Sequence, residues 1–593
     1  MERIFAHKSV VFALELLLNI NLYAQNEATV TVHVETAGSL HTLISEESRQ
    51  VIPNLTLTGN LNGADILFIR ELPYLTVLNL QGADMEDNLI PNRAFAGFER
   101  LGHIVLPNSI TSIGDAAFLG CSGLTDITVP NDVGFIGSMA FWECSRLTDI
   151  TLPEVLSIKS YTFYGCKSLT RITVPNSVVY IYNSAFRDCT GLTGITLSDN
   201  ISFIGGAAFS GCSSLTELVL PACVTTIGEY AFQGCSKLTG ITLPEGLTSI
   251  EWFTFHECTG LTDITLSNHI DSIKGYAFYG CTGLKSIVIP SSVTAIGGYA
   301  FSRCARLADV SLPVGLTSIG NSAFRECTGL THIALPNSVI SIGLAAFWGC
   351  SALTGITLPD GVTAIETSAF YDCSGLTSVT LPENLTSIGE DAFHGCTGLT
   401  HITLPDGVLF IGNSAFGECV NLTGITLPNS VTSIGEYAFQ SCVNLTGIMI
   451  PEKVVSIGKS AFGECISLTE VCSKNRVPPQ IQVGTHCFTD NTKMYGALIV
   501  PAGSTESYKN AYEWRDFFHI ETPNEKITTN PLNVYAYNGC IFIDSVGEEA
   551  VYIYHINGQL VKYLRMKGEQ AVPVKRGLYV VRAVNYSVKV FVE

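Results

Sequence analysis

Apolar and polar positions follow one pattern that returns every 23 residues along most of the chain. From Leu101 to about Glu470 this pattern is L-T-x-I-T-L-P-x-x-V-T-x-I-G-x-x-A-F-x-x-C-x-x. The period lies within the range of about 20 to 29 residues that is typical of leucine-rich repeats. Because one such unit cannot bury its apolar face alone, successive units must stack, and the sequence predicts a mainly β repeat solenoid.

The phenylalanine and cysteine positions keep this period closely. The element Phe-x-x-Cys occurs sixteen times, and every interval is 23 residues except that between Cys144 and Cys166, which is 22. The missing residue falls in the turn after Pro153. An earlier copy from Phe95 to Phe98 has phenylalanine at the cysteine position, so the sequence predicts about seventeen coils. With strands about 4.8 Å apart, these coils would extend roughly 80 Å along the axis.

Each repeat contains one clear strand pattern. In L-T-x-I-T-L-P the isoleucine and leucine side chains share one face, while threonine and the variable residue share the other, as in a half-buried strand. The proline cannot donate a hydrogen bond to a neighbouring strand, so residues such as Pro107 and Pro244 mark the corner where the chain turns. The segments V-T-x-I-G and A-F-x-x-C then supply further inward side chains.

We expect the phenylalanine and cysteine side chains to form continuous columns inside the rod, because each recurs once per coil. The first members of this structural ladder are Phe118, Phe141, Phe163, Phe186, Cys121, Cys144, Cys166 and Cys189. A line of thiols lacks the four converging ligands that zinc requires, so no metal or other cofactor is expected. Parallel in-register side chains favour buried free thiols, whereas an oxidising compartment would favour disulfides. Outside the column, Cys472 and Cys487 are the candidate bridge.

The first 24 residues have the features of a secretory signal peptide. Arg3 and Lys8 precede a short apolar stretch from Val10 to Leu18, and Ala24 stands at the expected cleavage position. The pattern predicts a protein that is secreted or held on the outer cell surface after cleavage near Ala24. The stretch is too short to cross a bilayer, and no other segment of about 20 apolar residues occurs.

Both ends of the solenoid depart from the internal repeat, as exposed solenoid ends require. Val30–Val34 is typical of a strand, and Ser39–Ile44 is typical of a helix with Ser39 as its cap. Near the other end, Leu498–Pro501 keeps a strand pattern and Ser504–Trp514 is typical of a short helix. These segments are predicted to close the rod.

The last part of the chain changes to alternating strand patterns. Val551–Tyr554 and Gln559–Lys562 flank Asn557-Gly558, a pair typical of a tight hairpin turn. About seven short strands in some 60 residues predict a small β-sandwich. The expected domains are a signal peptide (1–24), an N-terminal cap with irregular first repeats (25–97), leucine-rich repeats (98–471), a C-terminal cap (472–521), a linker (522–531) and the β-sandwich (532–593).

Composition narrows the possible functions. The 593 residues include 32 Lys or Arg and 52 Asp or Glu, and the net charge of −20 argues against binding to nucleic acid. Hydrophobic residues make up 47% and charged residues 14% of the chain, which is not the composition of a disordered protein. No G-x-S-x-G, H-E-x-x-H or glycine-rich phosphate loop occurs, so the sequence predicts that the protein is not an enzyme.

The variable position directly after each buried phenylalanine offers candidate binding residues. Because exposed aromatic residues are enriched in binding hot spots, a column of them on a rigid rod is a plausible contact stripe. Alternatively, these rings pack against neighbouring turns, with tyrosines three residues upstream such as Tyr161 and Tyr276 as partners. The candidates are Trp142, Tyr164, Tyr279, Trp348 and Tyr371, with His256 and His394 in the same column.

A second candidate surface is the variable column of the strand. Its mixed and mainly acidic character is typical of a solvated face. Its members include Asp126, Asp149, Arg171, Glu217, Asp263, Asp309, His332 and His401.

The motifs L-T-x-I-T-L-P and I-G-x-x-A-F-x-x-C resemble those of the BspA-like leucine-rich repeat family of bacterial surface proteins, over about 370 residues. The flanking segments Leu61–Asp65 and Val500–Trp514 also resemble the caps of that family. The resemblance implies an exported adhesin that binds host extracellular glycoproteins, such as fibronectin or fibrinogen, or other bacteria. A non-catalytic polysaccharide-binding protein and a structural spacer of the cell envelope are the alternatives.

The C-terminal segment is similar to the sorting domains of the type IX secretion system of Bacteroidota. The similarity lies in Tyr552-Ile-x-x-Ile-Asn-Gly-Gln-Leu-Val561, Gly577-Leu-Tyr579 and Lys589. The Asn-Pro-rich opening motif of those domains is present only as Asn530-Pro531. This resemblance implies that secretion machinery is a partner of the last domain.

Overall fold

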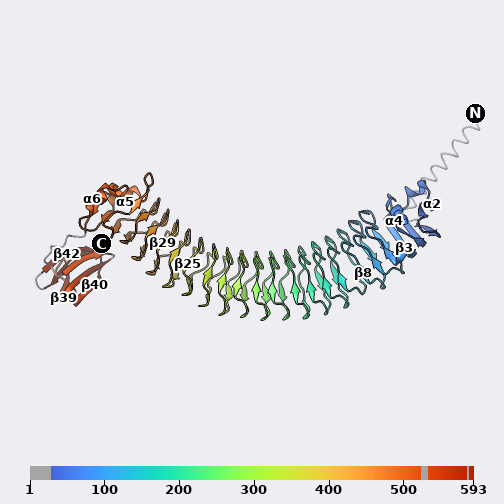
Figure 1. The fold of residues 1–593 in the computed structure, drawn as a ribbon, viewed down its shortest axis with the longest axis horizontal. Coiled ribbons are helices and arrows are strands. Elements are labelled where there is room, and N and C mark those ends of the chain that lie inside the picture. The colour runs from blue at the N-terminus through green and yellow to red at the C-terminus, as the bar shows by residue number, and fades with distance from the viewer. Residues whose placement is uncertain (1–28, 523–531, 538, 584–585, 593) are drawn as a thin grey trace, which may run out of the picture.

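The chain forms a curved rod of stacked turns that is followed in sequence by a barrel-like β-sheet (Figure 1). The rod contains about 21 turns, which confirms the predicted β solenoid. The expected signal peptide (1–24) and residues 523–531 of the expected linker lie outside the described residues. The computed structural model describes residues 29–522, 532–537, 539–583 and 586–592.

Most internal turns contain a first strand of three or four residues within L-T-x-I-T-L-P. These strands end before the corner proline, since proline offers no N–H to the next strand. The first strands are β5 (His103–Val105), β7 (Asp126–Thr128), β10 (Arg171–Thr173), β12 (Gly194–Thr196), β15 (Gly240–Thr242), β17 (Asp263–Thr265), β19 (Ser286–Val288), β21 (Asp309–Ser311), β24 (Gly355–Thr357), β26 (Ser378–Thr380), β28 (His401–Thr403), β30 (Gly424–Thr426), β32 (Gly447–Ile450) and β34 (Glu470–Ser473).

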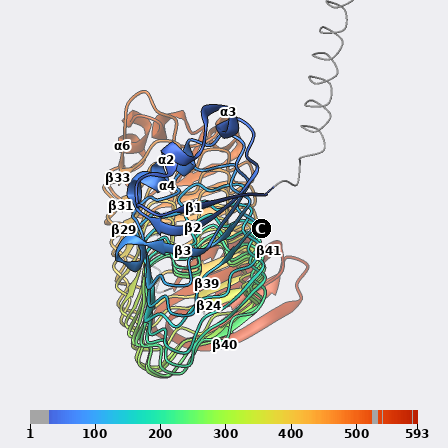
Figure 2. The same ribbon diagram turned by 90° about the vertical axis from the view of Figure 1, so that its right-hand side faces the viewer.

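A second strand of two residues follows within V-T-x-I-G, and it pairs in parallel with its equivalents in neighbouring turns. The second strands are β4 (Leu89–Ile90), β6 (Ser112–Ile113), β8 (Phe135–Ile136), β9 (Ser157–Ile158), β11 (Tyr180–Ile181), β13 (Phe203–Ile204), β14 (Thr226–Ile227), β16 (Ser249–Ile250), β18 (Ser272–Ile273), β20 (Ala295–Ile296), β22 (Ser318–Ile319), β23 (Ser341–Ile342), β25 (Ala364–Ile365), β27 (Ser387–Ile388), β29 (Phe410–Ile411), β31 (Ser433–Ile434), β33 (Ser456–Ile457) and β35 (Gln480–Ile481). Figure 2 shows β29, β31 and β33 along one side of the stack.

The N-terminal end continues the first-strand sheet in the order β1-β2-β3-β5-β7. This continuation is one reason why the rod has more turns than the seventeen expected coils. The hydroxyl of Ser39 donates to the carbonyl oxygen of Thr36 at 2.6 Å and makes no capping bond, so the expected Ser39 cap was wrong. The elements of this end are β1 (Thr29–Val34), α2 (Leu40–Leu43), α3 (Glu46–Arg49), β2 (Asn54–Leu61), α4 (Gly63–Arg70), β3 (Val77–Met85) and the 3₁₀ helix η1 (Glu86–Asn88).

A buried carboxylate joins the N-terminal segments. Asp65 accepts hydrogen bonds from the backbone N–H groups of Gly38 at 2.6 Å, Leu40 at 3.0 Å and Asn62 at 3.0 Å. The bond from Asn62 completes a capping box at the start of α4. One side chain therefore fixes both the start of α4 and the loop before α2.

The C-terminal end extends the sheet of β32 and β34 with β36 (Ala497–Ile499) and β37 (His519–Glu521). The helix expected over Ser504–Trp514 ends earlier, at Asn510, because the next residue, Ala511, adopts extended backbone angles. The remaining elements are α5 (Asp490–Tyr495), α6 (Thr505–Asn510) and the 3₁₀ helix η2 (Trp514–Asp516).

The segment after residue 531 forms one antiparallel sheet of five strands rather than about seven short ones. Two strands are long because β39 pairs with β38 through its first part, with β41 through its last part and with β40 along its other edge. The predicted hairpin turn is present, and Gly558 has a φ of 90° there. The strands are β38 (Leu532–Tyr537), β39 (Cys540–His555), β40 (Leu560–Pro573), β41 (Gly577–Ala583) and β42 (Tyr586–Val592).

A column of phenylalanine rings runs along the inside of the rod. Phe118 and Phe141 stack with ring centroids 5.4 Å apart and planes 4° apart. Across the shortened 22-residue repeat, Phe141 and Phe163 keep the same 5.4 Å spacing. The column continues to Phe488 and ends against the buried, tilted ring of Trp514.

The glycine that follows most second strands allows adjacent turns to approach closely. The N–H of Gly205 donates to the carbonyl oxygen of Ile181 at 2.7 Å, and a Cβ on Gly205 would lie 2.6 Å from the backbone nitrogen of Asn183. Among the turns of β6 to β33, this glycine is replaced by Lys159, Tyr182, Glu251, Lys274 and Glu366. The second-strand ladder is interrupted just before three of those turns, between β8 and β9, β14 and β16, and β23 and β25, whereas the turns of Tyr182 and Lys274 keep their pairing.

This close approach yields a prediction for Gly205→Ala. The added methyl group forces the turns of β11 and β13 apart, at a cost of about 1–3 kcal/mol that is typical of overpacking. Hydrogen exchange followed by mass spectrometry should therefore be faster in peptides that cover residues 180–206. Gly194→Ala in the same turn is the control, since no atom lies within 4 Å of the added Cβ. Equal exchange rates in the two variants would contradict the close-approach argument.

Candidate functional site

The structure gathers the candidate aromatic residues into separate clusters rather than one continuous stripe. All five side chains are half-buried. Trp142 lies against Tyr164 with ring centroids 4.4 Å apart, and Trp348 lies against Tyr371 at 4.3 Å. Tyr279 belongs to a third group of rings. Each candidate therefore packs against a neighbouring turn and still presents part of its side chain to solvent.

The first cluster lies near the N-terminal end of the rod. Tyr161 lies 5.1 Å from Trp142 and 6.1 Å from Tyr164, measured between ring centroids. The guanidinium group of Arg187 is 5.9 Å from the Tyr164 ring centroid. The expected packing partner Tyr161 is thus part of the same surface as the two candidates.

The middle cluster is larger than the sequence indicated. Tyr230, Phe253, Tyr276 and Tyr299 form one column, with centroid distances of 4.6, 4.7 and 4.7 Å. Tyr279 joins it at 5.7 Å from Tyr276. Sequence reasoning treated the tyrosines of this column as packing partners only and missed Phe253. The signal was present, because Glu-Trp-Phe replaces the usual small residues of I-G-x-x in that turn.

The third cluster extends across four successive turns. The Arg325 guanidinium lies 4.3 Å from the Trp348 ring centroid, and Tyr371 stacks on the next ring, His394, at 4.8 Å. Glu326 binds the Arg325 side chain at 3.2 Å. We call Arg325, Trp348, Tyr371 and His394 the Trp348 stack.

Ring pairs from these clusters cross the three interruptions of the second-strand ladder. The pair Trp142–Tyr164 crosses from the turn of β8 to that of β9, and Trp348–Tyr371 crosses from β23 to β25. At the remaining interruption Tyr230 stacks on Phe253. Stacking beyond simple burial is worth about 0.5–1.5 kcal/mol per pair, which is comparable to one lost hydrogen bond. These rings therefore reinforce boundaries where second-strand pairing is absent but other backbone bonds remain, such as that from the Glu143 N–H to the Tyr164 carbonyl oxygen at 2.7 Å.

Stacking also decides which parts of the rings a partner can reach. Because the faces lie on one another, mainly ring edges and hydroxyl groups remain exposed. Burial raises the pKa of Tyr276 and Tyr371, so both hydroxyls stay protonated at neutral pH. Burial lowers the pKa of His256, which favours a neutral ring stacked on Tyr279. The clusters thus offer uncharged donors and acceptors beside arginine.

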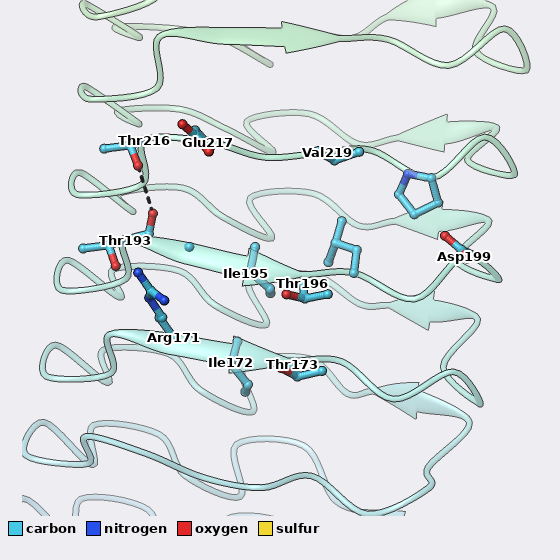
Figure 3. A pocket seen from close by; sticks show the side chains of 13 residues that line it. Arg171, Ile172, Thr173, Thr193, Ile195, Thr196, Asp199, Thr216, Glu217 and Val219 are labelled. Carbon is cyan, nitrogen blue, oxygen red and sulfur yellow. Dashed lines mark hydrogen bonds between the residues drawn. The ribbon is translucent and has the colours of Figure 1, made fainter.

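The second candidate surface, the variable column of the first strands, contains open hollows where that column has glycine. Arg171 and Glu217 lie two turns apart on either side of Gly194, in a hollow of about 650 Å³ (Figure 3). A similar hollow of about 710 Å³ contains Gly240 and Asp263. All eight predicted residues of this column are exposed, namely Asp126, Asp149, Arg171, Glu217, Asp263, Asp309, His332 and His401.

The threonines beside these hollows have a structural role. The hydroxyl of Thr216 donates to the carbonyl oxygen of Thr193 at 3.2 Å (Figure 3). The hydroxyl of Thr239 donates to the carbonyl oxygen of Thr216 in the same way at 3.4 Å. Within the residues that the structure describes, no group of three or more His, Cys, Asp or Glu side chains is placed to hold a metal ion. The strand face therefore has a mixed polar character.

The repeat region matches the model of a known protein family. Residues 88–495 match the BspA type Leucine rich repeat region in six overlapping copies. The chain belongs to the BspA-type leucine-rich repeat family. The copies lie at residues 88–216, 156–282, 203–331, 248–377, 294–419 and 364–495.

Several solved structures are similar to this BspA-type chain. A leucine-rich repeat protein from Bacteroides ovatus is 34% identical, with 59% of this chain and 88% of that chain covered and a TM-score of 0.48. The T. pallidum leucine-rich repeat protein is also 34% identical, with 31% and 77% covered and a TM-score of 0.26. A leucine-rich cell surface protein from Faecalibacterium prausnitzii is 23% identical, with 65% and 82% covered and a TM-score of 0.28. No curated protein sequence matches the chain.

The BspA-type cysteine column consists of buried free thiols. The Sγ of Cys281 donates to the carbonyl oxygen of Phe255 one turn earlier, at 3.0 Å, and that oxygen also accepts the N–H of Cys258 at 3.2 Å. Burial raises the pKa of Cys235 to about 12 and that of Cys281 well above its ordinary value. These thiols therefore stay protonated and act as donors. Equivalent Sγ bonds recur from Cys121 to Cys465 at 3.0 to 3.2 Å.

The candidate bridge between Cys472 and Cys487 is not formed, and both residues are free thiols. Cys472 lies on β34 between the buried side chains of Val471 and Ser473, so the alternation of the strand directs it outward. Cys487 is fully buried on the inner side. The two sulfur atoms thus belong to opposite sides of the strand layer.

The raised pKa values predict a sharp contrast in thiol reactivity. At pH 8 to 9 the column lacks the reactive thiolate, because its pKa values lie above that range, so Ellman's reagent should modify the exposed Cys223 first. The partly exposed Cys472 and Cys540 should follow more slowly, and the column should react only after unfolding. Cys223→Ser should remove the fast phase, whereas Cys281→Ser should not. Rapid modification of most thiols in the folded protein would refute this prediction.

Proposed function

We propose that this BspA-type protein is a recognition rod on the cell surface, an adhesin for host extracellular glycoproteins or other bacterial surfaces. Membership in the repeat family supports this proposal. The observation that carries it is the Trp348 stack, in which Arg, Trp, Tyr and His side chains from four successive turns form one half-exposed column.

The composition of the stack suits a protein-binding hot spot. Tryptophan, tyrosine and arginine are the residue types most enriched in hot spots. Stacking and the bond from Arg325 to Glu326 fix these side chains before a partner arrives, which lowers the entropy lost on binding. Glu326 also binds Arg303 at 3.0 Å, so the arginine side chains are held from both turns.

The same geometry favours protein over polysaccharide as the ligand. A sugar ring binds best on a free aromatic face, and in the Trp348 stack these faces are occupied by Arg325 and by neighbouring rings. Ring edges and hydroxyl groups remain available, and these suit the polar and aliphatic groups of a protein surface. Polysaccharide binding and a purely structural spacer are therefore the alternatives that an experiment must separate.

The proposed location rests on the two ends of the chain. The N-terminal 24 residues act as a signal peptide in this proposal, and the sheet of β38 to β42 acts as a sorting domain for secretion machinery. Within the described residues, no helix is both long enough and apolar enough to cross a membrane.

Replacing both Trp348 and Tyr371 by alanine tests the recognition role. Hot-spot truncations cost about 2 kcal/mol or more, so binding of the full-length protein to its glycoprotein partner should weaken at least tenfold. Surface plasmon resonance against immobilised fibronectin, fibrinogen and a panel of glycans provides the measurement. Because the stack crosses a ladder interruption, hydrogen exchange must show that the rod remains folded.

Tyr437→Ala is the matched control for this experiment. Tyr437 lies on the same flank, and its ring contacts Lys459 rather than another aromatic residue. This variant should bind like the unaltered protein. Unchanged binding of the double variant to glycoproteins and glycans would favour a structural spacer. Loss of glycan binding alone would favour a polysaccharide-binding protein.

Removal of residues 523–593 tests the sorting role. If the last domain directs export, the shortened chain should be made but should no longer be digested by protease added to intact cells. The full-length chain should be digested under the same conditions. Equal digestion of both chains would show that the solenoid reaches the surface without this domain.

A further inference from the structure

The second strands carry an unusual group of large side chains between residues 133 and 205. Most other turns have serine, alanine or threonine at the first position of the second strand, as in Ser249 and Ser272. The group begins at β8, which is labelled toward the N-terminal end of the rod in Figure 1. We name as the second-strand patch the side chains of Phe135, Leu156, Lys159, Tyr180, Tyr182 and Phe203.

The patch is continuous across successive turns. Tyr180 is directly opposite Phe203 in the register of β11 and β13. Tyr182 lies 6.1 Å from both rings, measured between centroids. The Lys159 Nζ lies 5.1 Å from the Tyr182 centroid and 5.7 Å from that of Phe135, so this ammonium group connects Phe135 to Tyr182.

Three side chains of the patch are exposed, and Lys159, Tyr182 and Phe203 are half-buried. Phe135 is 44%, Leu156 is 63% and Tyr180 is 38% exposed. The planes of Tyr182 and Phe203 differ by 54°, so these two rings do not cover each other as the rings of the Trp348 stack do. Contiguous exposed apolar groups can mark interaction sites, whereas apolar residues exposed singly are ordinary.

The turns that carry the patch differ in net charge from the protein as a whole. Residues 133–205 contain five acidic and five basic side chains, whereas the whole chain has a net charge of −20. Lys159 contacts two rings, and within the described part of the chain no carboxylate forms an ion pair with it. An acidic partner that is repelled elsewhere on the rod can therefore approach here.

We propose that the second-strand patch is the docking site for an acidic, apolar segment of another protein. A carboxylate of that segment pairs with Lys159, and its aliphatic or aromatic side chains cover Phe135, Tyr180 and Phe203. The patch extends over three turn spacings, roughly 14 Å, which matches about four or five residues of extended chain. Apolar side chains alternating with acidic ones satisfy both requirements.

A second copy of this chain is a poorer occupant. Two rods that each carry a charge of −20 repel each other along their length, and apposed patches would place two Lys159 ammonium groups near each other. The patch shares no residue with the Trp348 stack. If the patch does not bind an acidic segment, the proposed adhesin role of the Trp348 stack therefore remains possible. If the Trp348 stack does not bind a glycoprotein, the patch can still be a docking site.

The test uses the full-length protein and two pools of labelled pentapeptides. In one pool Val, Leu, Ile or Phe alternates with Asp or Glu, and in the other the same apolar residues alternate with Lys. Fluorescence anisotropy should show binding of the acidic pool and little binding of the basic pool. Binding should weaken as salt is added, because the ion pair with Lys159 is screened.

Two variants restore the residues that other turns use, so both should fold. Tyr180→Ser should weaken binding of the acidic pool at least tenfold, and Lys159→Gly should remove the preference for the acidic pool. Phe410→Ser is the matched control, because Phe410 occupies the same repeat position in β29 and is 51% exposed. This control should bind like the unaltered protein.

Three results would overturn the proposal. The first is equal binding of the acidic and the basic peptide pools. The second is a loss of binding in Phe410→Ser that equals the loss in Tyr180→Ser. The third is a dimer in sedimentation velocity that Tyr180→Ser dissociates, which would assign the patch to a second copy of the chain.

Discussion

Each turn of this rod shares backbone hydrogen bonds with its neighbours, and the rest of the structure depends on that constraint. The N–H groups of Ala116 and Phe118 donate to the carbonyl oxygens of Ser138 and Ala140 in the next turn, each at 2.8 Å. Ala116 adopts a φ of 55°, a conformation that costs an ordinary residue energy and persists where surrounding contacts fix it. Such bonds require turns of nearly equal shape, which explains why the sequence repeats so closely.

The interior could be predicted from the sequence because it follows directly from this periodicity. One phenylalanine per repeat requires ring to stack on ring, and Phe209 and Phe232 do so at 5.6 Å. The interruptions of the second-strand ladder could not be predicted so easily. They fall at Lys159, Glu251 and Glu366. However, Tyr182 and Lys274 also replace the glycine and keep the pairing, so this sequence position alone does not indicate where the ladder stops. The strand number of the last sheet was missed because one long strand contacts several partners, which a local pattern does not reveal.

The candidate site was predicted in part, for a related reason. The column after each phenylalanine correctly located rings such as Trp348, but it did not indicate which of them lie against each other. That grouping depends on which residue occupies the position two before the phenylalanine, where Phe253 and Tyr276 supply rings and many other turns have alanine or serine. In a repeat protein the common residues build the scaffold. The departures from the common pattern therefore carry both the local adjustments and the surfaces available to partners.

The shortened repeat has a wider meaning for how such a rod can change over time. Phe141 and Phe163 are 22 residues apart and Phe462 and Phe488 are 26 apart, yet their centroid distances are 5.4 and 5.3 Å. The spacing of the buried rings is thus set by the stacking of the turns and does not depend on the number of residues in a corner. Insertions and deletions at corners can accumulate without disturbing the buried rings, so new loops can be added to an old scaffold one turn at a time.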